Sequence, residues 1–169
     1  MKPIVSIIMG STSDLPVMEK AAKFFDEMEI PFEMNALSAH RTPPERVEGF
    51  AKAAQERGIK VIIAAAGMAA HLPGVIASMT SIPVIGVPID ASLDGMDALL
   101  AIVQMPPGIP VATVGINGSL NAAILALQMI ATGDENLQVR LAAYKESLKS
   151  KIEKANEDLS KVQYKFKTN

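Results

Sequence analysis

The stretch KVIIAAAGMAAHLPG, residues 60–74, decides the fold class of this chain. It opens with an apolar run rich in β-branched residues, which is typical of a buried strand over residues 60–66. A short loop with Gly67 and His71 follows, and Leu72 begins a stretch that reads as a helix over residues 72–80. A buried strand that leads through a short loop into a helix predicts one unit of a parallel sheet covered by helices.

The same alternation extends to both sides of this stretch. We expect further strands over residues 4–9, 31–37, 83–88 and 110–114, and further helices over residues 15–28, 44–57, 96–105 and 120–132. Five strands that alternate with helices predict an α/β protein, a three-layer αβα flavodoxin-like fold with a five-stranded parallel sheet. The length of 169 residues fits a single domain, with the αβα core over residues 1–132.

The C-terminal segment, residues 133–169, predicts one long amphipathic helix with a single apolar seam. The seam consists of Leu137, Leu141, Tyr144, Leu148, Ile152, Ala155, Leu159 and Val162. It could pack on the chain's own sheet, but we expect a neighbouring subunit, because the helix follows a sheet that is already complete. The preceding helix has only Asn121 and Gln128 as polar residues between positions 120 and 131, so we expect burial on every side, at a subunit interface.

Composition and charge exclude several classes of function. With 16 basic and 18 acidic side chains the net charge is -2, so the chain lacks the broad basic surface that binds nucleic acid. It has no cysteine, which excludes disulfides and thiolate chemistry and is typical of a cytoplasmic protein. Glycine, proline and histidine interrupt the apolar run over residues 61–79, so we expect no membrane span.

Polar residues gather in three loops, each directly after a predicted strand. These loops are residues 10–14, 38–43 and 67–74. Ligands of open parallel sheets bind at the carboxyl ends of the strands. We therefore expect a ligand site where these three loops meet.

The first loop has the chemistry of a nucleotide site. The hydroxyls of Ser11, Thr12 and Ser13, together with free backbone N–H groups at a helix start, can hold a phosphate. The carboxylate of Asp14 can accept hydrogen bonds from both hydroxyls of a ribose. Helix capping by Ser13 or Asp14 would explain the same residues, and this loop alone leaves both interpretations open.

The second loop contains Arg41, whose guanidinium offers a bidentate fork for a phosphate, although a surface salt bridge is the alternative. Its neighbour His40 and His71 of the third loop are the only histidines of the chain. A side chain that titrates near neutrality can transfer a proton. Two such residues at one sheet edge favour a catalytic site.

The third loop has almost no hydrogen-bonding side chain apart from His71. Its small residues could offer a flat surface and backbone groups to a planar ring, or could simply allow strand and helix to pack closely. The two histidines and Asp14 lack the close spacing of a metal site, so we expect no metal.

Four motifs, taken in order, resemble the PurE family, the N5-carboxyaminoimidazole ribonucleotide mutases. They are Ser11-x-Ser13-Asp14, Ser38-Ala39-His40-Arg41-Thr42-Pro43, Ala69-Ala70-His71-Leu72-Pro73-Gly74 and Ile102-Val103-Gln104-Met105-Pro106. The similarity extends from about residue 4 to residue 132, which is most of the chain. A single Ser-x-Ser-Asp would carry no weight, but four ordered motifs leave little room for chance.

This resemblance implies a single catalytic domain that assembles into a homo-octamer, with active sites completed by neighbouring subunits. It implies that Ser11, Ser38 and Arg41 hold the nucleotide phosphate, and that Asp14 and Ser13 hold the ribose. It also implies that Ala66, Gly67, His71 and Leu72 line the base and carboxylate pocket, and that Ala39 is a further substrate-binding residue.

The implied reaction belongs to de novo purine (IMP) biosynthesis and needs no cofactor. It moves a carboxylate from the amino group at C5 of an aminoimidazole ribonucleotide to C4. His40 is implied as the acid–base residue, which protonates the nitrogen and later removes the proton from C4. The implied functional partner is the ATP-dependent synthetase that makes the carbamate substrate.

This chain departs from the common pattern of the family in two places. Ala65-Ala66-Gly67-Met68 stands where many relatives have Gly-Ala-Gly-Gly, so Met68 narrows the expected pocket. The segment over residues 90–96 is also shorter than in bacterial relatives.

Two other functions are weaker alternatives. Direct carboxylation of aminoimidazole ribonucleotide by carbon dioxide keeps the fold and the nucleotide, but relatives with that activity tend to carry Lys after the histidine, where this chain has Arg41. A non-catalytic flavodoxin-like binding module is less favoured still. Aromatic residues make up only 4% of the chain and none is Trp, whereas flavin carriers usually stack an aromatic side chain on the flavin.

Overall fold

Five parallel strands form the centre of the protein in a computed structural model of residues 1–169. They are β1 (Val5–Met9), β2 (Phe32–Ala36), β3 (Val61–Gly67), β4 (Val84–Ile89) and β5 (Ala112–Thr113), in the spatial order β2-β1-β3-β4-β5. The strand order is that of flavodoxin-like folds, so the predicted fold class is confirmed. The inner strands are apolar because both of their faces are covered, whereas β2 at the edge is only half-buried.

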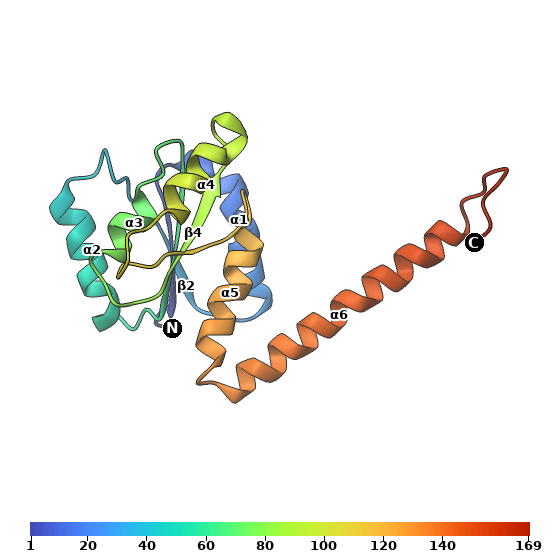
Figure 1. Cartoon of the computed structure of the whole chain (residues 1–169). Coiled ribbons are helices and arrows are strands. Elements are labelled where there is room, and N and C mark those ends of the chain that lie inside the picture. The colour runs from blue at the N-terminus through green and yellow to red at the C-terminus, as the bar shows by residue number, and fades with distance from the viewer. The chain divides into compact units, whose positions relative to one another are not determined.

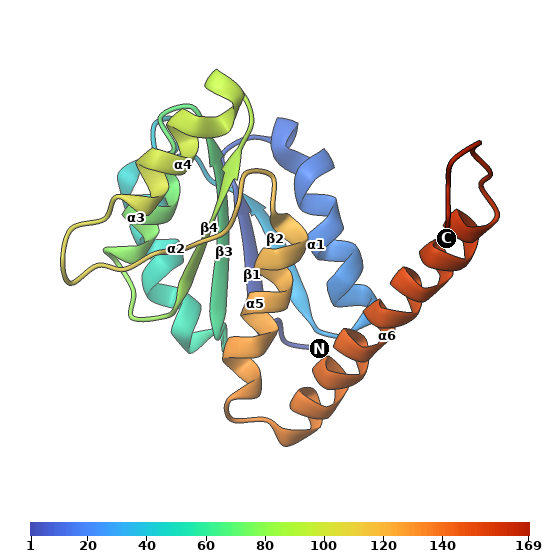
Figure 2. The ribbon, with the colours of Figure 1, turned by 45° about the vertical axis from the view of Figure 1, so that its right-hand side comes forward.

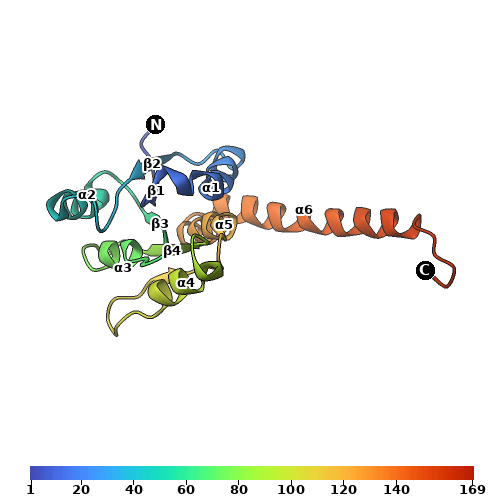
Figure 3. The ribbon, with the colours of Figure 1, turned by 90° about the horizontal axis from the view of Figure 1, so that it is seen from above.

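Helices cover both faces of the sheet (Figures 1 and 3). On one face lie α1 (Leu15–Glu27) and α5 (Ser119–Ala131), and on the other lie α2 (Pro44–Glu56), α3 (Leu72–Ala77) and α4 (Met96–Val103). Two single turns of 3-10 helix, η1 (Thr12–Asp14) and η2 (Leu93–Gly95), precede α1 and α4. The chain therefore has the three predicted layers.

The layer between the sheet and helices α2, α3 and α4 is closely packed. Its fully buried side chains include Ile62 of β3, Ile76 of α3 and Ile102 of α4. A Cβ atom placed on Gly86 of β4 would lie 2.3 Å from Cγ2 of Ile102, so only glycine lets α4 approach the sheet this closely. At Gly74 of α3 a Cβ atom would lie 3.0 Å from Sδ of Met105. Met105, a residue of the Ile102–Pro106 motif, therefore packs directly against α3.

The carboxyl ends of the strands meet at one edge of the sheet, the upper edge in Figure 2. Met9, the last residue of β1, pairs with Ala36 at the end of β2 and with Ala65 near the end of β3. Gly67 pairs with Ile89 at the end of β4. This register starts the loops after all four strands at nearly the same level, so residues far apart in sequence can form one site.

Two elements of the αβα core are shorter than the sequence predicts by more than two residues. The fifth strand, predicted over residues 110–114, pairs with β4 only at Ala112 and Thr113. The third helix, predicted to residue 80, ends at Ala77. Just beyond it, the N–H of Met79 donates a hydrogen bond to the carbonyl of Ile76, three residues back instead of four. Both differences are local and leave the sheet order unchanged.

Helix α5 is buried along one face within this chain. Ala122, Ala126 and Leu127 are fully buried, whereas Leu120 is exposed and Ile124 is half-buried. The predicted burial on every side is therefore not achieved by the single chain alone.

Residues 131–169 form a second compact unit. It contains the long helix α6 (Glu135–Ser160), whose N-cap is Asp134, with its carboxylate accepting a hydrogen bond of 3.0 Å from the N–H of Leu137. The prediction of one long C-terminal helix is met up to residue 160. Ile152 and Leu159 of the predicted seam are more than half exposed. None of the helices combines the length and apolar character of a membrane-crossing segment.

Candidate active site

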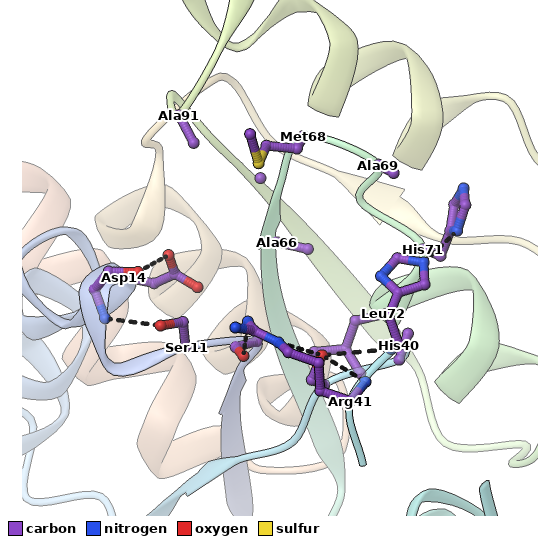
Figure 4. Close-up of a pocket in the computed structure, with 15 residues that line it drawn as sticks. Ser11, Asp14, His40, Arg41, Ala66, Met68, Ala69, His71, Leu72 and Ala91 are labelled. Carbon is purple, nitrogen blue, oxygen red and sulfur yellow. Dashed lines mark hydrogen bonds between the residues drawn. The ribbon is translucent and has the colours of Figure 1, made fainter. Parts of the chain in front are cut away.

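A cavity of about 150 Å³ opens at the carboxyl edge of the sheet, between the loops that follow β1, β2, β3 and β4 (Figure 4). Thr12, which the sequence also offered for the phosphate, does not line this cavity, but the other eleven residues that were expected in the site do. They are Ser11, Ser13, Asp14, Ser38, Ala39, His40, Arg41, Ala66, Gly67, His71 and Leu72. The cavity also has Gly10, Met68, Ala69 and Ala91 in its wall. Ala91 follows β4, so the rule that pointed to the other loops could have found it.

The loop after β1 is held by Ser11. This residue is the N-cap of η1, and its hydroxyl accepts a hydrogen bond of 3.3 Å from the N–H of Ser13. Asp14 precedes α1 but makes no side-chain capping bond. Capping therefore does not explain Asp14, whose carboxylate is left to accept hydrogen bonds from a ligand.

Asp14 is one of three buried polar residues, with 8% of its surface exposed. This burial raises the pKa of Asp14 above its ordinary value of 3.8. A backbone hydrogen bond from Ser11, one from the Ser13 hydroxyl and the nearby charge of Arg41 oppose the rise. The carboxylate thus lies in a place where hydroxyl donors from a ligand would stabilise its charge.

The loop after β2 is organised by Ser38 and Thr42. The hydroxyl of Ser38 accepts hydrogen bonds from the backbone N–H groups of His40 and Arg41, at 3.4 and 3.2 Å. The Thr42 hydroxyl accepts a bond of 2.8 Å from the N–H of Ser38. These bonds turn the loop back on itself, so that His40 and Arg41 project toward the cavity (Figure 4).

Arg41 connects the loops after β1 and β2. Its Nη2 donates a hydrogen bond of 3.2 Å to the carbonyl oxygen of Gly10, and its Nε lies 3.5 Å from the Ser38 hydroxyl. The guanidinium forms no salt bridge, unlike that of Arg57, which pairs with Glu33. The surface salt bridge considered for this residue is therefore not formed, and its charge is available to an anion beside Ser11 and Ser38.

His40 and His71 contact each other directly. Nε2 of His40 lies 2.9 Å from Nδ1 of His71, and the two rings meet edge to face with their centroids 4.9 Å apart. One nitrogen must donate and the other must accept, so the tautomers of the two rings are coupled. When Nε2 of His40 carries a proton, it can donate that proton's hydrogen bond to Nδ1 of His71.

The loop after β3 approaches the loop after β4 very closely. A Cβ atom on Gly67 would lie 2.9 Å from Cβ of Ala91 and 3.2 Å from the carbonyl oxygen of Ile89, so this position requires glycine. The next residue, Met68, has a positive φ of 56°, and its side chain is largely exposed. The wall on this side is made of small and apolar groups.

The cavity of this chain has room for part of a nucleotide. Pockets that enclose drug-sized ligands usually have about 300–1,000 Å³. No group of three or more His, Asp or Glu side chains lies close enough together to hold a metal ion. The arrangement combines hydroxyls and a guanidinium for an anion, a carboxylate for hydroxyl groups, and an imidazole pair for proton transfer.

Comparison with known proteins identifies relatives of this chain. The family model described as AIR carboxylase matches residues 4–151. The N5-carboxyaminoimidazole ribonucleotide mutase of Pyrococcus abyssi is 59% identical over 148 residues, which cover 87% of this chain and 84% of that protein. The phosphoribosylaminoimidazole carboxylase of Schizosaccharomyces pombe is 50% identical over 164 residues, which cover 96% of this chain but only 30% of that longer protein.

A solved structure agrees with this similarity. The crystal structure of Treponema denticola PurE2-S38D has a TM-score of 0.81 and 29% identity, and the match covers 97% of this chain and 100% of that one. The match of the family model over most of the chain and the high identity of the Pyrococcus relative confirm the resemblance seen in the four motifs. The chain belongs to the AIR carboxylase family, the family of the PurE proteins.

Proposed function

We propose that this chain is a 5-(carboxyamino)imidazole ribonucleotide mutase, an isomerase of de novo purine (IMP) biosynthesis. It converts N5-carboxyaminoimidazole ribonucleotide to 4-carboxy-5-aminoimidazole ribonucleotide. The observation that carries this proposal is His40, which lies in one cavity with Ser11, Asp14 and Arg41 and contacts His71 at 2.9 Å. The mutase of Pyrococcus abyssi, at 59% identity, supports the same activity.

The reaction needs one proton that leaves and returns. In the first step the carbon–nitrogen bond of the carbamate breaks, its electron pair stays on nitrogen, and the nitrogen takes a proton from protonated His40. Carbon dioxide and an electron-rich aminoimidazole ring remain. C4 then attacks the carbon of carbon dioxide with a pair of ring electrons, and neutral His40 removes the proton from C4. His40 ends in its starting state, and no atom is gained or lost.

The nucleotide is held by groups of two loops. Ser11, Ser38 and Arg41 bind the phosphate, a role supported by the free charge of the guanidinium and the two hydroxyls beside it. Asp14 and Ser13 bind the ribose hydroxyls, supported by a buried carboxylate without a capping role. Such contacts fix the ring beside His40, and fixed geometry supplies much of the rate in reactions of this kind.

The base and the migrating carboxylate lie against the end of β3 and the loop after it. Ala66, Gly67 and Leu72 offer apolar surface there, Leu72 is only 2% exposed, and Ala39 of the loop after β2 adds to this wall. His71 faces the carboxylate and also orients His40 through their hydrogen bond. An apolar wall suits a neutral intermediate such as carbon dioxide, because it excludes the water that would otherwise hydrate it.

Direct carboxylation of aminoimidazole ribonucleotide by carbon dioxide is the second candidate. The observation on its side is the 50% identity to the carboxylase of Schizosaccharomyces pombe, of which this chain spans only 30%. The mutase is favoured, because the Pyrococcus abyssi relative, which is 59% identical and matched over 84% of its length, is a mutase. In addition, Arg41 follows His40 where relatives that carboxylate directly tend to have Lys.

The active unit is a homo-octamer in the cytoplasm, with sites completed by neighbouring subunits. The small cavity of the single chain supports this proposal, as does the incomplete burial of α5. Helix α6 packs on a neighbouring subunit through its apolar seam, in which Ile152 is 64% exposed. Sedimentation of the wild-type chain and of Ile152→Glu tests the assembly: the variant should yield smaller species, and equal masses would contradict it.

The experiment that tests the function offers two substrates separately. One tube contains N5-carboxyaminoimidazole ribonucleotide, and the other contains aminoimidazole ribonucleotide with bicarbonate and dissolved carbon dioxide. The expected result is fast formation of the C4 carboxylate from the carbamate, even when free carbon dioxide is removed. Turnover only in the second tube would favour direct carboxylation, and turnover in neither would exclude both enzymes. An ATP-dependent synthetase that makes the carbamate is the proposed functional partner.

A further inference from the structure

Met68 combines three properties that packing does not explain. Its backbone is left-handed, with φ at 56°, a conformation that is unfavourable for residues other than glycine. Its side chain is 59% exposed, so the strain is not balanced by burial in the core. It lines the cavity of the proposed active site. Strain at an exposed apolar residue beside a site points to a role in that site.

The place of Met68 in the cavity suggests what this role is. In Figure 4 Met68 and Ala91 lie along one side of the cavity, with Ala66 beneath them, while His40 and Arg41 lie along the other side. The polar groups for the phosphate and for proton transfer therefore belong to one side. The side of Met68 has no charged group and closes the cavity with a thioether and methyl groups.

We propose that the Met68 side chain retains carbon dioxide in the cavity between its release from nitrogen and its capture by C4. This inference rests on the proposed function. Once the carbon–nitrogen bond breaks, the neutral molecule can react with C4 or escape, and the ratio of the two outcomes depends on the walls around it. Methionine suits this task, because its side chain is apolar, polarisable and able to adjust to a small neutral neighbour.

The substitution Met68→Gly separates the effect of backbone strain from the effect of carbon dioxide retention. Glycine adopts a positive φ without steric conflict, so Met68→Gly should fold at least as well as the wild type. The same change removes the wall beside the ring. When carbon dioxide escapes, the carbamate loses its carboxyl group, the nitrogen keeps its new proton, and free aminoimidazole ribonucleotide is released instead of the C4 carboxylate.

Leu93 provides a matched control for this substitution. It also has a positive φ, at 46°, and its side chain is 76% exposed, but it does not line the cavity. Leu93→Gly therefore relieves the same kind of strain and removes a similar exposed apolar side chain. It should leave the cavity wall intact.

The test uses the full-length wild type, Met68→Gly, Met68→Leu and Leu93→Gly. Each is given carbamate substrate labelled with ¹³C in its carboxyl group, in excess unlabelled bicarbonate. Two products are measured: labelled C4 carboxylate, and aminoimidazole ribonucleotide released beyond the amount in a tube without enzyme. We expect Met68→Gly to release at least about threefold more of it per turnover, since a small change in the barrier to escape suffices for this. Met68→Leu keeps an apolar side chain in the wall and should release less of it than Met68→Gly, whereas Leu93→Gly should stay close to the wild type.

Several outcomes would overturn the role of Met68. Equal retention of label by Met68→Gly and the wild type would do so, and so would an equal loss in Leu93→Gly. A change in oligomer mass of Met68→Gly with unchanged label retention would mean that Met68 contacts another copy of the chain instead. Absence of any turnover of the carbamate by the wild type would contradict the proposed function, and is thereby distinguished from a failure of this inference.

Discussion

Gly86 and Gly10 have the same side chain and opposite surroundings. A Cβ atom on Gly86, in the middle of β4, would lie 2.3 Å from Ile102 and 3.1 Å from Val111. A Cβ atom on Gly10, at the end of β1, would meet no atom within 4 Å. The layer around Gly86 is filled to the point where one methyl group is too many, whereas the carboxyl end of β1 leaves room.

This difference separates two tasks. Interior positions determine whether the chain folds, because close-packed layers tolerate little change in volume. Edge positions present exposed or strained groups, such as His40, Arg41 and Met68, that add little to stability. Substitutions in the interior should therefore change the free energy of unfolding, and substitutions at the edge should change turnover or binding.

The largest effect is expected at His40. His40→Asn removes the proton carrier, so kcat should fall by about 10² to 10⁴. The affinity for the nucleotide and the free energy of unfolding should stay close to wild type, because the ring is exposed and the phosphate contacts remain. Kinetics, titration calorimetry and urea unfolding measure the three quantities. Equal losses of binding and turnover would contradict the role of His40.

The partner imidazole distinguishes proton transfer from positioning. His71→Asn keeps His40 but removes the ring that contacts its Nε2 at 2.9 Å. Its kcat should fall by less than that of His40→Asn, because the proton carrier remains but loses the contact that holds its ring. An unchanged kcat would mean that His71 does not orient His40.

The next effect is expected in the interior. Gly86→Ala forces its new methyl group onto Ile102, and such overpacking should lower the free energy of unfolding by about 1–3 kcal/mol. Gly10→Ala is the matched control and should change it by less than about 0.5 kcal/mol. Urea unfolding of both variants makes the comparison. Equal destabilisation by the two substitutions would contradict the separation of interior and edge.

A smaller effect is expected at Arg41. Arg41→Ala removes a charge-assisted phosphate contact, so the dissociation constant of the nucleotide should rise by about tenfold. Stability should hardly change, because the exposed guanidinium has no salt bridge to lose. Titration calorimetry at two salt concentrations measures the binding. An unchanged dissociation constant would exclude the phosphate role.

The smallest effect is expected at Asp14, and it is a gain in stability. Burial raises the pKa of Asp14 above 3.8, so the folded state binds more protons than the unfolded state just above that pH. Stability contributed by this group therefore falls as pH rises from 3.8 through the folded pKa, and the penalty is complete above it. Asp14→Asn should be more stable than wild type at pH 7, and the difference should shrink as pH falls toward 3.8.

Urea unfolding across this pH range measures the effect. A variant less stable than wild type at neutral pH would show that the carboxylate supports the fold. The predicted sign would instead mark Asp14 as an edge residue retained for binding a ligand.

The sequence was sufficient for five parallel strands, their order and most of the residues that line the cavity. Apolar runs predict parallel strands, and the loops after them then meet at one edge, which explains why Ser11, Arg41 and His71 line one cavity. The contacts between side chains of different loops at that edge could not be predicted from the sequence. The 2.9 Å approach of His40 to His71 depends on how the loops after β2 and β3 bend over β1 between them.

Met68 was noticed in the sequence as a departure, but its backbone was not predictable. Only a few per cent of residues other than glycine adopt a positive φ, so no local pattern indicates one at a methionine. The fifth strand was predicted over residues 110–114, but only Ala112 and Thr113 pair with β4, and this length depends on the neighbouring strand as well as on the strand's own residues.

The hydrogen bond from Arg41 to the carbonyl of Gly10 has a consequence for how substrate is captured. A long, flexible side chain is docked across two loops before any ligand arrives, so its loss of rotational freedom belongs to folding and not to binding. An incoming phosphate meets a binding site that is already formed. Its oxygens replace the carbonyl of Gly10 as the hydrogen-bond acceptor of Arg41. Encounter can then proceed without waiting for a rearrangement of the protein.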